Sequence, residues 1–180
     1  MVSEKELVAE LQNKDTQSRA FEVLVKTYKE RLYWHIRSIV LNHDDADDVL
    51  QNTFVKVYRN MDGFKGDSKL FSWMYRIATN KSLSFLKQKS GKLGLNGMEY
   101  QERLVGNLKA DVYFEGNEIQ LQLQKAIATV PEKQKLVFNM KYFQELKYEE
   151  ISEILDTTVG GLKASYHLAA KKIEAFLKED

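Results

Sequence analysis

Apolar residues recur at helical spacing along most of this chain, and few residues interrupt the helices that this spacing predicts. Three stripes with i, i+3 and i+4 intervals run through Phe21–Ile39, Val49–Val57 and Leu70–Leu86. The 180 residues include one proline and nine glycines, and the period-two alternation of strands is hard to find. The sequence therefore predicts an all-α protein, with helices near residues 4–12, 17–41, 45–60 and 68–88.

The helical pattern is interrupted between residues 89 and 116. This stretch contains five of the nine glycines and shows no sustained apolar period, which is typical of a flexible linker. A loop of this length is unusual inside one compact domain. We therefore predict two helical domains, at residues 1–90 and 117–180, that are joined by a flexible linker over residues 91–116 and are mobile in the free protein.

The second half of the chain ends in the pattern of a helix-turn-helix. Tyr148–Leu155 is predicted to form a short helix, residues 156–158 a turn with a threonine N-cap, and Val159–Ile173 a helix with one apolar face. In this motif the second helix enters the major groove of DNA. The outward residues are then candidates for DNA contact: Thr158, Gly160, Gly161, Lys163, Ala164, Ser165, His167, Leu168 and Lys171. The same spacing also fits an ordinary helical hairpin, because the motif has no invariant chemistry.

Charge is distributed unevenly along the chain, although the net charge is only +1. Nine basic and two acidic residues lie between Lys56 and Lys92, whereas two basic and five acidic residues lie between Leu93 and Gln124. An acidic cluster, "NHDDADDVL" at residues 42–50, precedes the basic block. The chain therefore alternates an acidic cluster, a basic block and an acidic stretch, and it ends in a basic tail near Lys171 and Lys172.

The acidic cluster has three interpretations. A phosphohydrolase could bind a metal ion through His35, His43, Asp44 and a later aspartate, but the chain has only three histidines. A calcium loop is excluded, because the glycine that it requires is absent. The second interpretation is helix capping by Asp44 or Asp45, with acidic groups that complement the helix dipole. The third is a surface that binds a basic partner, because capping does not need Asp47 and Asp48 together.

Several classes of protein are disfavoured by composition. The chain has no cysteine, so it has no disulfide framework and no thiolate metal site. Its charged and amphipathic N-terminus does not resemble a signal peptide, and no stretch approaches the roughly 20 apolar residues of a membrane span. We expect a cytoplasmic protein without direct membrane insertion and without a cofactor.

Four stretches together resemble the extracytoplasmic-function (ECF, group 4) sigma factors of bacterial RNA polymerase, which belong to the sigma-70 family. The resemblance covers the chain from about Phe21 to Leu177, and the stretches occur in the family's order. They are "DADDVLQNTFVKVYRNMDGF" (45–64), "SKLFSWMYRIATNKSLSFLK" (68–87), "VPEKQKLVFNMKYFQELKYEEISEIL" (130–155) and "TTVGGLKASYHLAAKKI" (157–173). The resemblance implies a sigma-2 domain, a linker and a sigma-4 domain with the helix-turn-helix. It also implies a promoter-specificity subunit rather than an enzyme.

The resemblance implies partners for each surface. In the family, the acidic helix docks on the clamp helices of the polymerase β′ subunit, which assigns polymerase binding to Asp47, Asp48, Gln51, Asn52 and Tyr58. Other expected partners are the β flap, promoter DNA as duplex and single strand, and an anti-sigma factor. In the family, the acidic linker threads towards the RNA exit path.

The resemblance also implies two DNA elements. The helix-turn-helix would bind the −35 duplex, and the loop at 63–70 with the helix after it would open the −10 element and hold a flipped base. The candidate −10 residues are Lys65, Asp67, Ser68, Lys69, Arg76, Asn80 and Lys81. Trp73 falls on the apolar stripe and is expected in the core.

Three positions depart from the family pattern. Asn52 replaces a usual glutamate, and Ser165 and Leu168 replace frequent arginines of the recognition helix. The −35 sequence therefore cannot be inferred from relatives. The main alternative is a one-component transcription regulator with a helical sensing domain, which would bind duplex DNA but would have no need for the acidic helix.

Overall fold

The computed structural model describes residues 2–111, 114 and 116–179, and these residues form helices and connecting segments without any strand. The N-terminal half, residues 2–92, is built from four α-helices and a short 3₁₀ turn. They are α1 (Glu4–Gln12), α2 (Gln17–Val40), α3 (His43–Asn60), η1 (Met61–Gly63) and α4 (Leu70–Lys92). The four helices predicted for this half are confirmed, with ends that differ by up to four residues.

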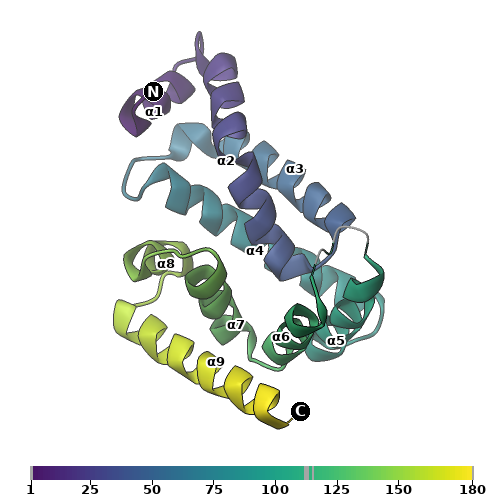
Figure 1. The fold of residues 1–180 in the computed structure, drawn as a ribbon. Helices are drawn as coiled ribbons and strands as arrows, with labels where there is room; N and C mark the ends of the chain where they lie inside the picture. The colour runs from purple at the N-terminus through teal and green to yellow at the C-terminus, as the bar shows by residue number, and fades with distance from the viewer. Residues whose placement is uncertain (1, 112–113, 115, 180) are drawn as a thin grey trace.

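The core of the N-terminal half lies between α2, α3 and α4, which pack against one another (Figure 1). Apolar residues of the three sequence stripes are buried there, including Ile36, Val57 and Met74, all fully or almost fully enclosed. Trp73 is half-buried against this core, and its ring lies 5.0 Å from the ring of Phe64, centroid to centroid. The expectation that Trp73 is a packing residue is confirmed.

The segment between the halves is more ordered than its glycines suggested. Residues Gly97–Asn107 form α5, and Leu108–Ala110 form the short helix η2, which corrects the expectation that residues 89–116 lack a sustained helix. A reciprocal capping box between Asn96 and Glu99 begins α5. Its buried apolar residues are Tyr100, Leu104, Val105 and, one turn on, Leu108. Residues 112, 113 and 115 of the predicted linker lie outside the described residues, as do the chain ends 1 and 180.

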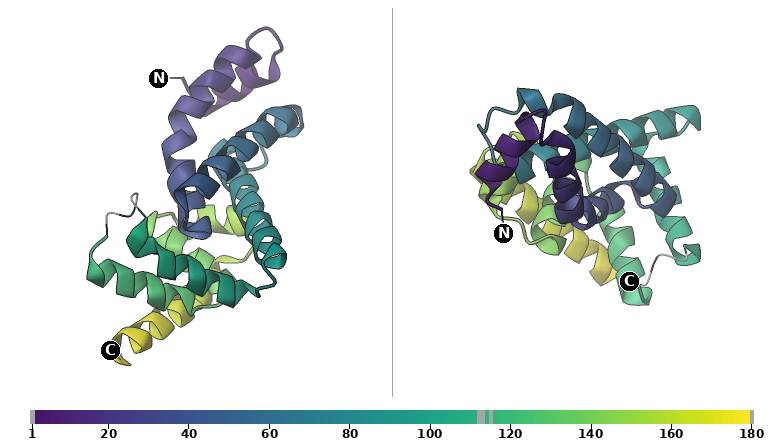
Figure 2. Two further views of the ribbon diagram at one scale, coloured as in Figure 1. Left: turned by 90° about the vertical axis from the view of Figure 1, so that its right-hand side faces the viewer. Right: turned by 90° about the horizontal axis from the view of Figure 1, so that it is seen from above.

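The C-terminal half, residues 117–179, contains the remaining helices. They are α6 (Glu118–Ala128), α7 (Glu132–Phe138), the π-helical segment η3 (Asn139–Phe143), α8 (Tyr148–Leu155) and α9 (Val159–Glu179). Helix α7 begins directly after Pro131, which occupies the N-cap position. Figure 2 shows α9 as the long C-terminal helix along one side of the molecule.

The two halves lie against each other in this structure. A single cluster of buried apolar side chains includes Met74 and Ala78 of α4 together with Ile151 and Ile154 of α8. The buried imidazole of His35 on α2 contacts the side-chain amide of Gln144 at a distance of 3.0 Å. At the end of η2, Arg37 of α2 pairs with Asp111 at 2.6 Å. The boundaries 1–90, 91–116 and 117–180 stay predictions.

Candidate functional site

The acidic cluster lies at the start of α3. The helix begins at His43, two residues earlier than predicted, and the side chain of Asn42 accepts a hydrogen bond from the backbone N–H of Asp45 at 2.9 Å. Asn42 is therefore the N-cap, which corrects the expectation that Asp44 or Asp45 has this role. Because the cap lies outside the acidic run, the aspartates are distributed around the first turns of the helix.

The aspartates of α3 have different surroundings. Asp45 is half-buried with Lys89 at 3.8 Å, and burial raises the pKa of its carboxyl group, an effect that Lys89 opposes. Asp47 lies 3.6 Å from His43. The five residues expected to bind polymerase are all exposed on α3, and we call them the α3 surface: Asp47, Asp48, Gln51, Asn52 and Tyr58. The opposite side of the same helix is buried. Within the α3 surface, the ring of Tyr58 also packs edge-on against Phe21 of α2, with 5.0 Å between the ring centroids.

An apolar depression of about 330 Å³ adjoins the α3 surface, and sequence reasoning did not identify it. It lies between α2 and α3 and is lined by Phe21, Phe54, Val55, Tyr58 and Arg59. Val55 is 46% exposed, although valine is normally buried in a helix of this kind. The sequence signal for this depression was Val55, an apolar residue outside the buried stripe of α3. Apolar contacts next to exposed carboxylates are typical of a protein-binding surface.

The two histidines of the metal-site interpretation, His35 and His43, contact different partners. The ring of His35 is buried between Thr79 and Gln144, whereas His43 contacts the hydroxyl of Tyr33 at 2.6 Å. Within the described part of the chain, no group of three histidine or acidic side chains could hold a metal ion.

The loop before α4 contains four of the expected −10 residues: Lys65, Asp67, Ser68 and Lys69. The first helix of the chain holds both ends of this loop. The side-chain amide of Gln12 donates to the carbonyl oxygen of Phe64 at 2.7 Å, and the backbone N–H of Leu70 donates to the carboxylate of Glu4 at 2.8 Å. Glu4 thus caps α4 from a distant part of the sequence, a contact that local reasoning could not find.

Further −10 candidates lie along α4. Arg76 and Asn80 are exposed on the helix, and Lys81 is half-buried. Arg76 donates a hydrogen bond to the backbone carbonyl oxygen of Glu153 at 2.5 Å, and Lys69 lies 3.9 Å from the carboxylate of Glu150. Both acceptors belong to α8. Two of the expected −10 residues, Lys69 and Arg76, therefore contact the C-terminal half.

The helix-turn-helix is formed as the sequence predicts. Asp156 ends α8 in the left-handed conformation, with a φ of 51°, and its aspartate side chain tolerates this backbone. The hydroxyl of Thr158 accepts a hydrogen bond from the N–H of Gly161 at 3.1 Å, which confirms the threonine N-cap of α9. Leu162, Ala169 and Ile173 are buried along the inward side of α9. The turn thereby fixes the orientation of the second helix.

The outward side of α9 carries the residues expected to contact the −35 element. Exposed members are Thr158, Gly160, Lys163, Ala164, His167, Leu168 and Lys171, whereas Gly161 and Ser165 are half-buried near the turn. The ammonium group of Lys163 also lies 5.8 Å from the ring centroid of Tyr148 on α8. A helix with small residues at its exposed start and cations further along suits major-groove binding.

Comparison with protein-family models matches both halves of the chain. The model of sigma-70 region 2 matches residues 24–91, and that of sigma-70 region 4 matches residues 120–173. The ECF RNA polymerase sigma factor SigW of Bacillus subtilis is 30% identical over 169 residues, which covers 89% of this chain and 90% of the relative. The chain belongs to the extracytoplasmic-function sigma factors.

Other relatives and solved structures agree with this assignment. The ECF RNA polymerase sigma-E factor of Haemophilus influenzae is 29% identical over 184 residues, covering 96% of this chain and 94% of the relative. The structure of CnrH in complex with the cytosolic domain of CnrY aligns with a TM-score of 0.72, 21% identity and 98% coverage of both chains. The sigma factor RpoE of Bartonella quintana, in complex with the anti-sigma factor NepR, aligns with a TM-score of 0.65 and 20% identity, over 89% of this chain and 98% of that chain.

As a sigma factor, the chain binds core RNA polymerase and promoter DNA. It directs promoter-specific initiation by recognising the −35 duplex and melting the −10 element. The region 2 match covers most of the segment that a one-component regulator would use as a sensing domain. None of the described helices is long and apolar enough to cross a membrane.

Proposed function

We propose that this sigma factor docks on the clamp helices of the polymerase β′ subunit through the α3 surface. The observation that carries the proposal is the exposure of all five residues on a helix whose other side is buried. In one interface, the carboxylates can pair with arginine side chains, and the adjacent apolar depression can hold apolar side chains of the partner. Electrostatic attraction supplies orientation and a fast encounter.

The −10 element is assigned to the loop before α4 and to the exposed residues of α4. Single-stranded DNA binds where cations lie near aromatic rings, and Lys65 and Lys69 lie in the sequence between Phe64 and Trp73, whose rings pair. A flipped base must regain a few kcal/mol of lost stacking from such a pocket. Lys65, Asp67, Ser68, Lys69, Arg76, Asn80 and Lys81 are the proposed residues.

The −35 element is assigned to the outward side of α9. The side chains proposed to contact DNA phosphates are Lys163, His167 and Lys171. The small residues between Thr158 and Ala164 allow the helix to approach the base edges closely. The β flap is the proposed partner of the C-terminal half. The chain itself carries out no catalysis and acts in the cytoplasm with polymerase, and its acidic linker follows the RNA exit path.

An anti-sigma factor is a further proposed partner. Both solved structures named above are complexes with a second protein, and in the RpoE complex that protein is the anti-sigma factor NepR. The likeness of fold over nearly the whole chain supports a similar partner here.

Binding to core polymerase tests the docking proposal. We expect tight binding by the unaltered protein and binding weakened well over tenfold by Asp48→Lys, because the reversed charge faces an arginine-rich surface. Asp15→Lys is the matched control, since Asp15 is exposed in the connection between α1 and α2. Equal binding by both variants would refute the α3 surface as the docking site. No binding to an active cognate core would refute the whole proposal.

A further inference from the structure

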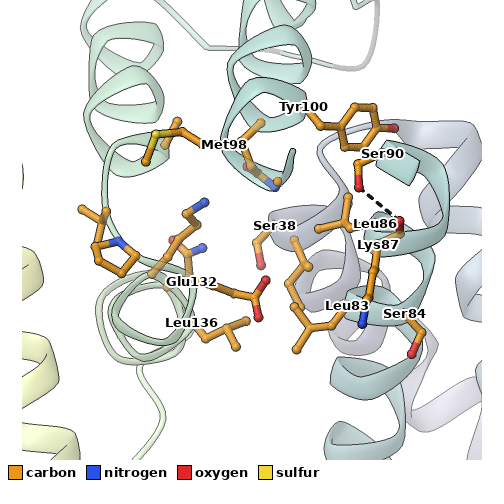
Figure 3. Close-up of a pocket in the computed structure, with 18 residues that line it drawn as sticks. Ser38, Leu83, Ser84, Leu86, Lys87, Ser90, Met98, Tyr100, Glu132 and Leu136 are labelled. Atoms are coloured by element: carbon orange, nitrogen blue, oxygen red, sulfur yellow. Dashed lines mark hydrogen bonds between the residues drawn. The ribbon is translucent and has the colours of Figure 1, made fainter. Parts of the chain in front are cut away.

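A cavity of about 500 Å³ lies among α2, α4, α5 and α7 (Figure 3). Tightly packed protein interiors have few voids larger than a water molecule, whereas small-molecule sites occupy ~300–1,000 Å³. No residue that is assigned to polymerase or to DNA lines this cavity. The proposed function therefore leaves the cavity without a role.

Two helical segments turn one face each towards the cavity. On both segments, lining residues recur at i, i+3, i+4 and i+7, which is the spacing of one helix face. They are Leu83, Leu86, Lys87 and Ser90 on α4, and Glu132, Lys135, Leu136 and Asn139 on α7 and η3. Helix α5 adds Met98 and Gln101. Polar and apolar side chains from three directions thus border one shared space.

The apolar part of the lining lies on opposite sides of the cavity. Figure 3 shows Leu83 and Leu86 of α4 facing Leu136 of α7, with Met98 of α5 at the top of the view. Removal of apolar surface from water favours binding of a ring or a hydrocarbon chain between such walls. The cavity therefore suits a ligand with an apolar body.

Two side-chain amides in the lining are buried without a protein partner. Asn139 is 5% exposed and Gln101 is 9% exposed. Neither amide forms a hydrogen bond with a residue that the structure describes. Buried polar groups nearly always have a hydrogen-bond partner, and an unpaired one lowers the stability of the fold. Both amides therefore point to a polar group that enters the cavity.

A cation lies one helical turn before Asn139. Lys135 is half-buried, and burial lowers the pKa of its ammonium group, an effect that Glu132 opposes. Side chains four residues apart share a helix face, so one carboxylate can accept hydrogen bonds from Lys135 and Asn139 together. The other charged lining residues, Glu132 and Lys87, are exposed and opposite in sign. The inner part of the cavity consequently has a single positive charge.

We propose that this cavity binds a small organic monocarboxylate with an apolar body. The carboxylate lies between the ammonium group of Lys135 and the amide nitrogen of Asn139, and the amide of Gln101 is a further donor. The apolar body packs between Leu83 and Leu136. One bound anion matches the single inner cation and provides both buried amides with an acceptor. Because the ligand binds the folded chain, it also raises the thermal stability of the protein.

Calorimetric titration with two acids tests the site. The probes are decanoate and naphthalene-2-carboxylate, and the neutral controls of matched shape are decan-1-ol and naphthalene-2-carboxamide. We expect at least one acid to bind with a Kd below about 1 mM, and its neutral analogue to bind at least tenfold more weakly. The neutral analogue cannot pair with the ammonium group of Lys135. Absence of binding by both acids, or equal binding of acid and neutral analogue, would overturn the proposal.

Substitutions at the polar end of the cavity locate the bound acid. Lys135→Met and Asn139→Leu each remove a donor while keeping the size of the side chain, and each should weaken binding at least tenfold. Lys133→Met is the matched control and should bind within twofold of the unaltered protein, because Lys133 is exposed on α7 and does not line the cavity. Binding that both cavity variants retain would place the acid elsewhere, such as the depression beside Val55, and would refute the site.

The stability of the unliganded protein separates a binding role of Asn139 from a structural one. Asn139→Leu should raise the midpoint of thermal unfolding, since it removes an unpaired buried amide. A lower midpoint together with unchanged binding would show that Asn139 supports the fold alone, which contradicts the proposal.

Methyl NMR of the unaltered protein does not depend on the folding of any variant. Met98 lines the cavity, whereas Met61 is buried in the core of the N-terminal half. With labelled methionine methyl groups, saturating acid should shift the resonance of Met98 and leave that of Met61 in place. An unchanged Met98 resonance in the presence of bound acid would overturn the proposed location.

Discussion

The imidazole of His35 is buried between the two halves, and its contacts determine its protonation state. The side-chain amide nitrogen of Gln144 can only donate, so Nδ1 of His35 accepts this bond at 3.0 Å. Nε2 then carries the proton and donates to the hydroxyl of Thr79 at 2.7 Å, which donates onward to the carbonyl oxygen of Tyr75. Burial lowers the pKa of His35 to about 4.

This histidine predicts a loss of stability in mild acid. The pKa is lower in the folded state than the ordinary 6.5, so stability from neutral His35 is complete above pH 6.5 and is lost as pH falls towards 4. At pH 5 the loss is about 2 kcal/mol, because one pKa unit corresponds to about 1.4 kcal/mol. Urea unfolding at pH 7.5 and pH 5 measures it. His35→Gln should reduce the pH dependence, and an unchanged dependence in that variant would contradict the assignment.

The two glycines at the start of α9 are predicted to differ in their tolerance of alanine. A Cβ on Gly160 would meet nothing within 4 Å, whereas a Cβ on Gly161 would lie 3.1 Å from the hydroxyl of Thr158. Gly160→Ala should raise the free energy of unfolding by about 0.5–1 kcal/mol, because alanine favours helix. The same methyl group should weaken binding to −35 duplex DNA. Thermal unfolding and DNA titration measure the two effects, and Gly161→Ala, expected to destabilise, is the comparison.

At the scale of the element, α3 shows how one residue outside the acidic cluster determines where the helix begins. Asn42 caps the helix, so the aspartates after it remain available for other contacts. Asn42→Ala should lower the free energy of unfolding by about 1 kcal/mol, because an N–H of the first turn loses its acceptor. Chemical denaturation measures this change. Asp48→Asn, at an exposed position beyond the cap, should change stability by less than half as much. A comparable loss from both would argue against Asn42 as the cap.

Helix α5 illustrates a limit of reading glycine as a break. Gly97 and Gly106 suggested a linker, yet neither has a positive φ, and a Cβ on either would meet no neighbour. These glycines therefore weaken the helix only through backbone entropy. Burial of Tyr100, Leu104 and Val105 outweighs that cost. The asparagine–glutamate capping box at 96–99 was the overlooked local signal.

At the scale of the whole molecule, the shared core predicts coupled unfolding of the halves. Both tryptophans, Trp34 and Trp73, lie in the N-terminal half, so tryptophan fluorescence reports that half alone. Ile151 in α8 is fully buried in the core cluster that includes Met74 of α4. Ile151→Ala should destabilise the protein by about 2–5 kcal/mol and shift the fluorescence transition.

Ile119→Ala is the control for this experiment, because Ile119 is 78% exposed on α6. It should leave the fluorescence transition in place. The halves unfold independently if Ile151→Ala also leaves the fluorescence transition unchanged while far-UV circular dichroism reports early loss of the C-terminal helices.

The sequence by itself determined the four helices of the N-terminal half, the helix-turn-helix and the family, because each depends on spacing within a short stretch. Apolar periodicity defines a helix over a few turns, and Thr158 caps α9 from three residues away. Tertiary structure alone decided the contacts between distant residues. Glu4 caps α4 across 66 positions, and Gln144 reaches His35 across 109. No local pattern encodes such pairs, since they depend on how whole helices pack. The contact between α4 and α8 is of this kind.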